Sequence, residues 1–518
     1  MQEPHTYSVS GNCGRRYTTM SKINIKEPSV VIREKRLGTI NAFTGTASQI
    51  VEKSAKGELR DCKRKFSQCL GCNQQQAFCQ LAMIRDAVVI NHAPIGCAGE
   101  FADFNFTYRV EQARRDLPPA LGRYYCTNLL EKDTVFGAAK KLEDTIKLAY
   151  EREHPNAIFV TTSCASGIIG EDIEAVVDAA SEELGIPVVT CNCEGFRSKI
   201  WTTGFDAAYH TVLRGIVKPA QKKTNKINII NFWGSHVFDE IIERFGYEPQ
   251  YIIPFSTVEQ LSHISEAAAS IHICPSLSTY MGAGLNQLHG VPEVLVPPAY
   301  GVAGTDRWLR AFGKLVGKEE LAEEIIKEGH EKYLPEIEKL KERFKGKKAY
   351  VTAGAAHGQA LITLLGELGM DVVGAAVFHH DPVYDSGDDK LDILGQAVKN
   401  YGDVPDYRVC NKQACELVNA LNRIKPDLIL ARHGGMTLWG AKFGIPSLLI
   451  GDEQFGIGYK GALNYARRID DALDSIEFIK NYSKHASNPY TKWWFEQDPG
   501  YFQGDGSGRG CAAGKGGV

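Results

Sequence analysis

The sequence lacks a long apolar run, and this absence limits the class of protein. A membrane-spanning helix needs about 20 consecutive, predominantly apolar residues, and no stretch of the 518-residue sequence meets that requirement. Residues Met1–Met20 are polar and contain no hydrophobic middle region, so we expect no secretion signal. These features predict a cytoplasmic protein that does not enter a membrane.

An excess of basic charge is also missing. The chain has 59 Lys and Arg residues against 62 Asp and Glu residues, which gives a formal net charge of −3. Proteins that bind nucleic acid normally carry a basic patch or stripe, so we expect neither nucleic acid nor an anionic lipid surface as a partner. The hydrophobic fraction of 43% and the charged fraction of 23% are those of an ordinary globular protein.

Cysteine is abundant, with 14 residues in the chain. Disulfides are disfavoured in the cytoplasm, where clustered cysteines more often bind metal or do redox work. For isolated thiols we favour an inert role. These are Cys13, Cys410, Cys415 and Cys511. The cysteines crowded between residues 62 and 97 are harder to explain in that way.

The chain repeats one pattern three times. Short β-branched runs, such as Ala87–Asn91 and Ile158–Thr162, alternate with amphipathic stretches, and the pattern restarts at Ile227–Phe232 and at Lys348–Thr352. Strands that alternate with helices predict parallel sheets covered on both faces. The predicted fold class is therefore α/β, with three Rossmann-like domains.

The predicted organisation has five parts. They are a wrapping N-terminal segment (1–50), a first α/β domain (51–222), a second (223–345), a third (346–490) and a Gly-rich, disordered tail (491–518). In open α/β sheets ligands collect outside the carboxyl ends of the strands. The loops that follow the strands are therefore where chemistry is expected.

Three cysteines fall in such loops. Cys97, Cys164 and Cys274 each follow a predicted strand, at Ala87–Asn91, Ile158–Val160 and Ile271–Ile273. A thiolate near a helix N-terminus has a lowered pKa and binds soft metals, and iron–sulfur clusters are common occupants of multiple-thiolate sites. The wide spacing excludes a local zinc finger. Three ligands also leave a cluster incomplete unless a partner chain supplies more.

At these residues the sequence resembles the large component of nitrogenase and its relatives. The resemblance covers roughly residues 58–471 and rests on several motifs in register. They are Cys72, His92–Cys97 (HAPIGC), Glu131–Gly137 (EKDTVFG), Ser163-Cys164, Gly167–Glu174 (GIIGEDIE) and Cys193–Arg197 (CEGFR). The resemblance is to the α-type subunit of that family.

The resemblance implies cofactors and partners. Cys72, Cys97 and Cys164 would hold half of a P-cluster-like iron–sulfur centre, shared with a β-type homologous subunit in an α2β2 heterotetramer. An ATP-dependent iron protein would supply electrons. Cys274 would bind a second iron–sulfur cofactor, and Arg197 would donate a hydrogen bond to it or form a salt bridge. The pair His379-His380 follows a strand, so one of them, His380, is expected at the cofactor as proton donor or replacement ligand.

Departures from the family pattern shift the expected chemistry. The second cofactor ligand of a nitrogenase is a histidine, but the matching position here is about Gly451. The histidine that helps protonate substrate is replaced by Phe205, and Trp201 stands in place of a polar residue. Phenylalanine cannot donate a proton, and the pocket is expected to be more apolar. Reduction of dinitrogen is therefore the weakest of three candidate functions.

The other two candidates differ in whether the protein turns over a substrate. The first is a nitrogenase-like reductase, such as a methylthio-alkane reductase, which cleaves C–S bonds in small thioethers. The second is a scaffold for cofactor assembly. A structural iron–sulfur or substrate-binding module is a further, non-enzymatic alternative. The roles of Cys62, Cys69, Cys79 and Cys126 stay open, either at an additional small metal site or lining the same centre.

Overall fold

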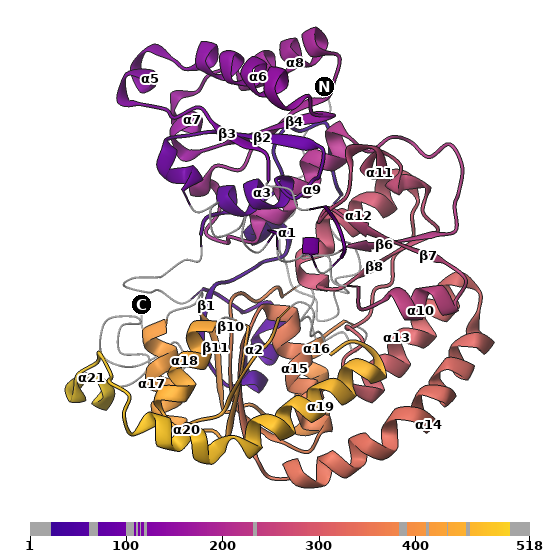
Figure 1. Ribbon diagram of the computed structural model, residues 1–518, viewed down its shortest axis with the longest axis vertical. Helices are drawn as coiled ribbons and strands as arrows, with labels where there is room; N and C mark the ends of the chain where they lie inside the picture. The colour runs from indigo at the N-terminus through magenta and orange to yellow at the C-terminus, as the bar shows by residue number, and fades with distance from the viewer. Residues whose placement is uncertain are drawn as a thin grey trace.

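The computed structural model describes residues 22–61, 71–99, 108–109, 112–113, 115–118, 122–230, 236–382, 391–410, 414–432, 434–451 and 456–497. They form three α/β units around three separate sheets (Figure 1). This confirms the predicted fold class of parallel sheets in three Rossmann-like units. Within the described residues, no helix is both long and apolar enough to cross a membrane.

The first unit, at the top of Figure 1, is a four-stranded parallel sheet. Its order is β3 (Tyr124–Cys126), β2 (Ala87–His92), β4 (Ala157–Thr162) and β5 (Val188–Cys191). Every residue of the two central strands, β2 and β4, is buried. Continuous apolar runs are expected where both faces of a parallel sheet are covered, which explains why these strands were recognisable in the sequence.

Helices cover both faces of this first sheet. One face carries α6 (Ala139–Glu153) and α8 (Ile173–Leu184), and the other carries α3 (Asn73–Leu81) and α9 (Thr203–Gly215). The short segments at the carboxyl ends of the strands are 3₁₀ turns and brief helices. They are Ile95–Ala98, α5 (Glu131–Phe136), α7 (Cys164–Ile169) and Gly195–Arg197.

The second unit has a three-stranded parallel sheet. Its order is β7 (Glu248–Ile252), β6 (Lys226–Ile230) and β8 (Ala269–His272), with α10 (Asp239–Arg244), α11 (Val258–Ser262), the 3₁₀ turn Ile264–Glu266 and α12 (Pro275–His289). Two long helices follow, α13 (Gly301–Val316) and α14 (Glu319–Phe344). Gly317 has φ +66° and ends α13, because a left-handed backbone conformation suits glycine.

The third unit, in the lower part of Figure 1, is a six-stranded sheet. Its order is β1 (Ala42–Gly45), β11 (Asp406–Cys410), β10 (Asp371–Val377), β9 (Lys348–Ala353), β12 (Leu428–Ala431) and β13 (Ser447–Leu449). Its helices are α15 (Ala355–Glu367), α16 (Ile393–Tyr401), α17 (Ala414–Ile424), α18 (Gly434–Lys442), α19 (Gly458–Asp474) and α20 (Ile476–Ser483). All pairs are parallel except that of β1, which runs antiparallel to β11.

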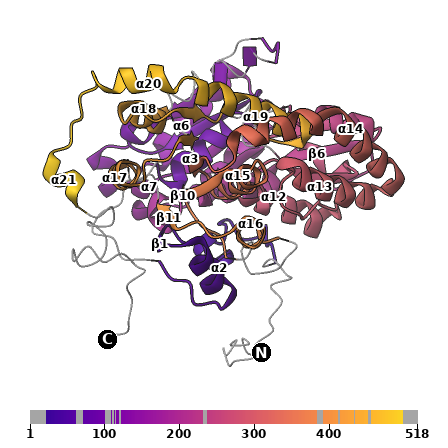
Figure 2. The same ribbon diagram turned by 90° about the horizontal axis from the view of Figure 1, so that it is seen from below.

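The N-terminal segment connects the three units. It contains α1 (Arg33–Arg36), β1 and α2 (Ala47–Ala55), and Figure 2 shows α2 beside α16. The Ile23 amide donates to Gln287 in the second unit at 2.9 Å, and Ser29 pairs with Asn192 in the first. Because β1 then joins the third sheet, this segment is tied to all three units rather than lying loosely on the surface.

Buried charges lie where the three units meet. The guanidinium of Arg33 donates to both carboxylate oxygens of Asp206, at 3.1 and 2.9 Å, and both side chains are fully buried. Arg36 donates to the same carboxylate at 2.7 Å. Arg33 also lies 3.6 Å from Asp381 and donates to the Leu277 carbonyl. One arginine of the N-terminal segment thus contacts all three units.

The end of the described chain differs from the expected tail. Residues Lys492–Glu496 form a short helix, α21, because aromatic rings anchor it. Tyr490 stacks on Trp494 at 4.1 Å between ring centroids and also contacts Trp439, while Phe495 contacts Phe443. Residues 498–518 lie outside the described part of the chain.

The buried ion pair predicts a stability effect. Asp206→Asn leaves Arg33 and Arg36 buried without a compensating charge, so we expect a loss of about 3–5 kcal/mol in the free energy of unfolding. Urea denaturation followed by circular dichroism measures this change. As a control, Glu52→Gln removes one partner of the exposed Glu52–Lys56 pair and should leave the midpoint unchanged. Equal midpoints for the two variants would contradict the prediction.

Candidate metal centre

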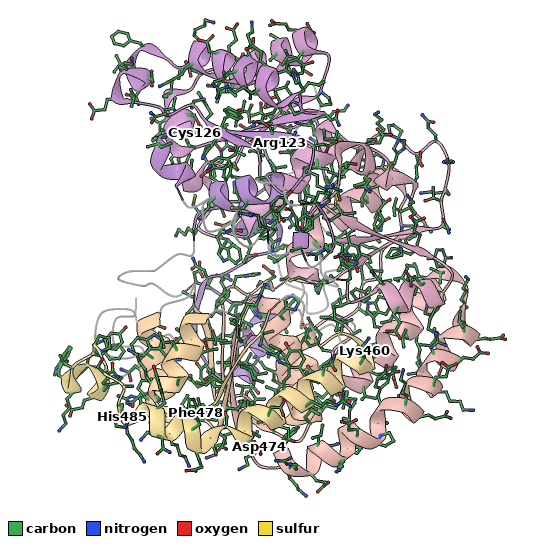
Figure 3. All side chains as sticks on the ribbon, in the orientation of Figure 1. Arg123, Cys126, Lys460, Asp474, Phe478 and His485 are labelled. Carbon is green, nitrogen blue, oxygen red and sulfur yellow. The ribbon has the colours of Figure 1, made fainter. Side chains whose placement is uncertain are left out.

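The carboxyl ends of the first sheet's four strands meet at one edge, and a cysteine follows or ends each of them. Cys126 ends β3, Cys97 lies in the 3₁₀ turn after β2, Cys164 follows β4, and Cys193 follows β5. Figure 3 labels Cys126 beside the strands of this sheet. Because the strands are parallel, residues separated by many positions in the sequence arrive at the same place.

Two of the predicted ligands begin helices. Cys72 is the N-cap residue of α3, and Cys164 is the first residue of α7. Ser163 precedes Cys164 and caps α7 by accepting a hydrogen bond from the Ser166 amide. The exposed N–H groups of a helix N-terminus favour a negatively charged thiolate. The backbone therefore places both Cys72 and Cys164 at helix N-termini.

The three predicted thiols are close together and exposed. A Cβ atom added to Gly195 would lie 3.1 Å from the sulfur of Cys164 and 3.3 Å from that of Cys72, so this glycine leaves the space between them open. Burial raises the pKa of the Cys97 thiol, and the thiols of Cys72, Cys164 and Cys126 raise it further. Cys72, Cys97 and Cys164 are all exposed.

Several thiols gathered at one sheet edge form a donor set of the kind that iron–sulfur clusters use. Among the described residues, no three Cys, His, Asp or Glu side chains converge closely enough for one metal ion. Negative charges gathered at one place disfavour the ionisation of neighbouring thiols. The positive iron ions of a cluster that several thiolates bind offset this repulsion. The donor set and the glycine between two sulfurs therefore fit an iron–sulfur group.

Neighbouring cysteines have other environments. The Cys126 thiol donates to the Ala93 carbonyl at 3.3 Å. Cys193 is buried and donates to the Thr162 carbonyl, and burial together with Cys191 raises its pKa well above the ordinary value. Cys79 lies in the hydrophobic core. Cys62 and Cys69 lie outside the described residues, so the possible additional site there stays a prediction.

Arg197 lies beside the exposed thiols rather than beside Cys274. It follows Gly195 in the chain, and its guanidinium pairs with Glu194 at 2.5 Å and donates to Ser29 at 2.8 Å. Glu194 is almost fully buried. Of the two roles expected for Arg197, the structure places it in a salt bridge.

Cys274 occupies a different environment, at the junction of the three units. It is the N-cap residue of α12, is 3% exposed, and its sulfur lies 3.4 Å from the Ser276 hydroxyl. Burial raises the pKa of the thiol, whereas Ser276 and the buried Arg33 oppose that shift. The nearby His272 is hydrogen-bonded to Ser278 and Glu293, at 2.7 and 2.9 Å. Both of its ring nitrogens therefore already have a partner.

The two adjacent histidines are buried in different surroundings. His380 exchanges backbone hydrogen bonds with Ile40, and burial lowers its pKa to about 4. His379 lies 3.4 Å from Asp381, and its ring meets the Trp201 ring edge-on at 6.3 Å between centroids. Trp201 in turn contacts Phe205 at 5.9 Å. We call the buried residues Cys274, Asp381, His379, Trp201 and Phe205 the junction cluster.

Sequence reasoning missed the charged members of this junction. Arg33 comes from a segment expected to wrap the surface, yet it is completely buried, and its charge acts on Cys274 and Asp381. His379, followed by the charge of Arg33, holds the pKa of Asp381 well below its usual range, although burial opposes this shift. An arginine with no apolar periodicity around it gives no sequence signal of burial.

The fold and the thiol-rich sheet edge define a three-unit α/β protein with a site for an iron–sulfur group. The chain belongs to the nitrogenase component 1 type oxidoreductase family, whose model matches residues 72–474. This confirms the resemblance seen in the sequence. The family relation also agrees with iron–sulfur binding as the general role of the site.

Two relatives and one solved structure illustrate this membership. The chain is 27% identical over 480 residues to the nitrogenase iron-molybdenum cofactor biosynthesis protein NifE of Methanococcus maripaludis, covering 87% of this chain and 93% of that protein. It is 31% identical over 403 residues to the nitrogenase molybdenum-iron protein alpha chain of Methanothermobacter thermautotrophicus, covering 74% and 83%. The structure titled "Nitrogenase Cp1 at pH 6.5" has a TM-score of 0.64 at 22% identity, over 83% of this chain and 94% of that one.

The open space at Gly195 predicts an effect on iron binding. Gly195→Ala places a methyl group against the sulfurs of Cys72 and Cys164, so we expect it to lose most of the iron held at this sheet edge. Iron and acid-labile sulfide analysis of the purified complex measures this loss. Gly96→Ala is a matched control, since nothing lies within 4 Å of its added methyl group although it adjoins Cys97. Full iron content in the Gly195→Ala variant would contradict the assignment.

Proposed function

We propose that this chain is the α-type subunit of a nitrogenase-like reductase, in which Cys72, Cys97 and Cys164 hold an iron–sulfur cluster shared with a partner subunit. The observation that carries the proposal is the exposure of all three thiols at one sheet edge. Ligands of a cluster enclosed within one chain would be buried. Exposed ligands leave the outer side of the cluster to a second protein, here a β-type homologous subunit in an α2β2 assembly.

An exposed apolar rim surrounds the three thiols and supports a protein interface there. We define this rim by five side chains that are between 59% and 87% exposed: Ile95, Val135, Phe136, Ile168 and Phe196. Ile168 lies on the helix that begins at Cys164, and Phe196 adjoins Gly195. Contiguous exposed apolar side chains mark interaction sites. In the proposed complex the rim is covered by the partner subunit or by the ATP-dependent iron protein.

The junction cluster is the proposed site of the second iron–sulfur cofactor. The Cys274 thiolate would bind it at the N-terminus of α12, with the Arg33 charge nearby to offset the negative charge of that thiolate. When bound, such a group accepts electrons and delivers them to a substrate. The proposed site lies inside the chain, because Cys274, Trp201, Phe205, His379 and Asp381 are each no more than 8% exposed.

The aromatic rings of the junction cluster favour a small, mostly apolar substrate. Phe205 is completely buried, and its side chain has no group that could donate a proton or a hydrogen bond. Its ring packs between those of Trp201 and Tyr209. These aromatic rings suit the alkyl groups of a thioether. We therefore propose the reductive C–S cleavage of methylthio-alkanes, which yields a thiol and a hydrocarbon. The reduction of dinitrogen requires many coupled proton deliveries. These apolar rings are less compatible with such proton transfer.

A scaffold role in cofactor assembly is the second candidate. Its support is the relation to the NifE protein of Methanococcus maripaludis, which extends over 93% of that protein. A scaffold would use the same thiols but would hand its cluster to another protein. The two candidates therefore differ in turnover and not in the architecture of the site.

Turnover with a thioether distinguishes these candidates. The purified complex, supplied with its iron protein, ATP and dimethyl sulfide, is expected to release methane, measured by gas chromatography of the headspace. Omitting ATP should abolish the product. A scaffold should release no methane and should instead transfer iron to an apo-acceptor, and this result would replace the reductase proposal.

Replacing the proposed cofactor ligand gives a second prediction. In Cys274→Ala we expect methane release to fall at least about 100-fold, since losing even a residue that supports a metal ligand typically costs about 10–100-fold and the ligand itself should cost no less. The iron bound through Cys72, Cys97 and Cys164 should stay in place, as measured by iron analysis and electronic absorption. Cys410→Ala, which removes a buried thiol of the third unit, is the control. Undiminished turnover in Cys274→Ala would contradict a cofactor at this residue.

The apolar rim gives a third prediction. Ile168→Asp puts a charge in the proposed interface and should weaken binding of the co-expressed β-type subunit at least about tenfold, which corresponds to about 1.4 kcal/mol. Analytical ultracentrifugation measures the change. Phe478 is similarly exposed but lies on α20, near the bottom of Figure 3 and far from the labelled Cys126. Phe478→Asp should leave the complex intact, and equal effects of both variants would exclude the rim as the interface.

A further inference from the structure

A buried carboxylate lies beside the exposed thiols of the first sheet. The side chain of Glu194 is 4% exposed, and Nε of Arg197 lies 2.5 Å from its Oε2 atom. A charge that is removed from water in this way is tolerated when it is paired. Glu194 directly precedes Gly195, the glycine that lies against two of the thiol sulfurs. The ion pair therefore brings a negative and a positive charge to the metal centre.

Contacts on two sides fix Glu194 between the helices that begin at the thiols. The side chain of Asn73, which follows Cys72, donates to the Glu194 carbonyl at 3.1 Å. On the other side Glu194 packs against Gly167, because a Cβ atom added there would lie 2.8 Å from its Cγ and 3.3 Å from its Oε1. Gly167 lies on α7, the helix whose first residue is Cys164. Neighbours of two predicted ligands thus hold the carboxylate in place.

The carboxylate is close enough to act on a cluster bound at Cys164. Cβ positions three residues apart on a helix are about 5–6 Å apart, so Oε1 of Glu194 lies within about 9 Å of the Cys164 Cβ atom. At an effective dielectric constant of about 20, a unit charge at about 12 Å changes a one-electron equilibrium about tenfold. Charge and solvent exposure are among the factors that set the reduction potential of an iron–sulfur cluster. One carboxylate at this position is therefore enough to shift that potential measurably.

The two members of the pair differ in their exposure to water. The Arg197 side chain is 40% exposed, against 4% for that of Glu194. Exposed charges are screened more strongly than buried ones, so the arginine offsets the field of the carboxylate only in part. Arg197 also donates to the Ser29 hydroxyl at 2.8 Å, which fixes the guanidinium from a second side. The net effect of the pair on its surroundings is that of a partly compensated negative charge.

We propose that the Glu194–Arg197 pair sets the reduction potential of the cluster held by Cys72, Cys97 and Cys164. The inference rests on the proposed function, because it needs a cluster at these thiols. The Glu194 carboxylate stabilises the oxidised state and lowers the potential, whereas Arg197 stabilises the reduced state and raises it. Neither residue binds iron, and both act on the cluster through their charges.

The test removes each charge singly and then both together, in the holo-complex at pH 8. Redox titration followed by electron paramagnetic resonance measures the potential of the cluster, and iron analysis measures its content. Glu194→Gln should raise the potential by about 59 mV, which is a tenfold change for a one-electron couple. Arg197→Gln should lower the potential by a smaller amount, because its charge is more strongly screened. The double variant should lie between the two single variants.

Arg197→Lys and Arg244→Gln are the controls. Arg197→Lys keeps the positive charge and should keep the potential near that of the wild type. Arg244 is 39% exposed and pairs with Glu328 at 2.8 Å, so it matches Arg197 in exposure and pairing. It lies on α10 of the second unit, away from the first sheet (Figure 1). Arg244→Gln should therefore leave the potential unchanged.

Shifts of opposite sign in the two single variants are the result that the proposal requires. Shifts of the same sign, loss of iron in both variants, or unchanged potentials at full iron content would overturn it. If Glu194→Gln does not fold, Arg197→Gln and Arg197→Lys decide the matter, and equal potentials in these two would contradict the proposal. If the wild-type complex held no iron dependent on Cys72, Cys97 and Cys164, the proposed function itself would fail, and iron analysis alone would reveal that.

Discussion

The buried ion pair between Arg33 and Asp206 is the interaction on which the assembly of the three units depends. Both charges are inaccessible to water, so neither is tolerated unless the other is in place. Arg33 comes from the N-terminal segment and Asp206 from the first unit. The same guanidinium reaches Asp381 of the third unit and the Leu277 carbonyl of the second. This set of contacts therefore holds the three units together at the junction cluster.

Burial separates the two thiol sites. Cys72, Cys97 and Cys164 are exposed at a sheet edge, where helix N-termini and the absent side chain of Gly195 favour a bound cluster. Cys274 is buried among Arg33, Asp381 and aromatic rings. In the proposed function, the exposed thiols need a partner subunit to complete their cluster, whereas the buried thiol of Cys274 serves a group enclosed by this chain. The two environments are consistent with electron entry at the surface and chemistry at the junction.

The sequence was informative where a strand is buried on both faces. The strands β2, β4 and β9 contain continuous apolar or β-branched runs and were recognisable. Two strands gave weaker signals. In β7 a proline and mostly half-exposed side chains hide the strand at the sheet edge. The four residues of β1 become a strand only because they pair with β11, far away in the sequence.

The sequence by itself determined the α/β class, the family and the three cysteines at strand ends, because parallel strands and their loops leave a periodic record of burial. The tertiary structure decided what surrounds those cysteines. It placed Arg197 in a salt bridge beside Gly195, and it buried Arg33 next to Cys274. It also brought Trp201 against His379 from another unit. Such contacts join residues whose local sequence carries no trace of their partners, so only the folded chain reveals them.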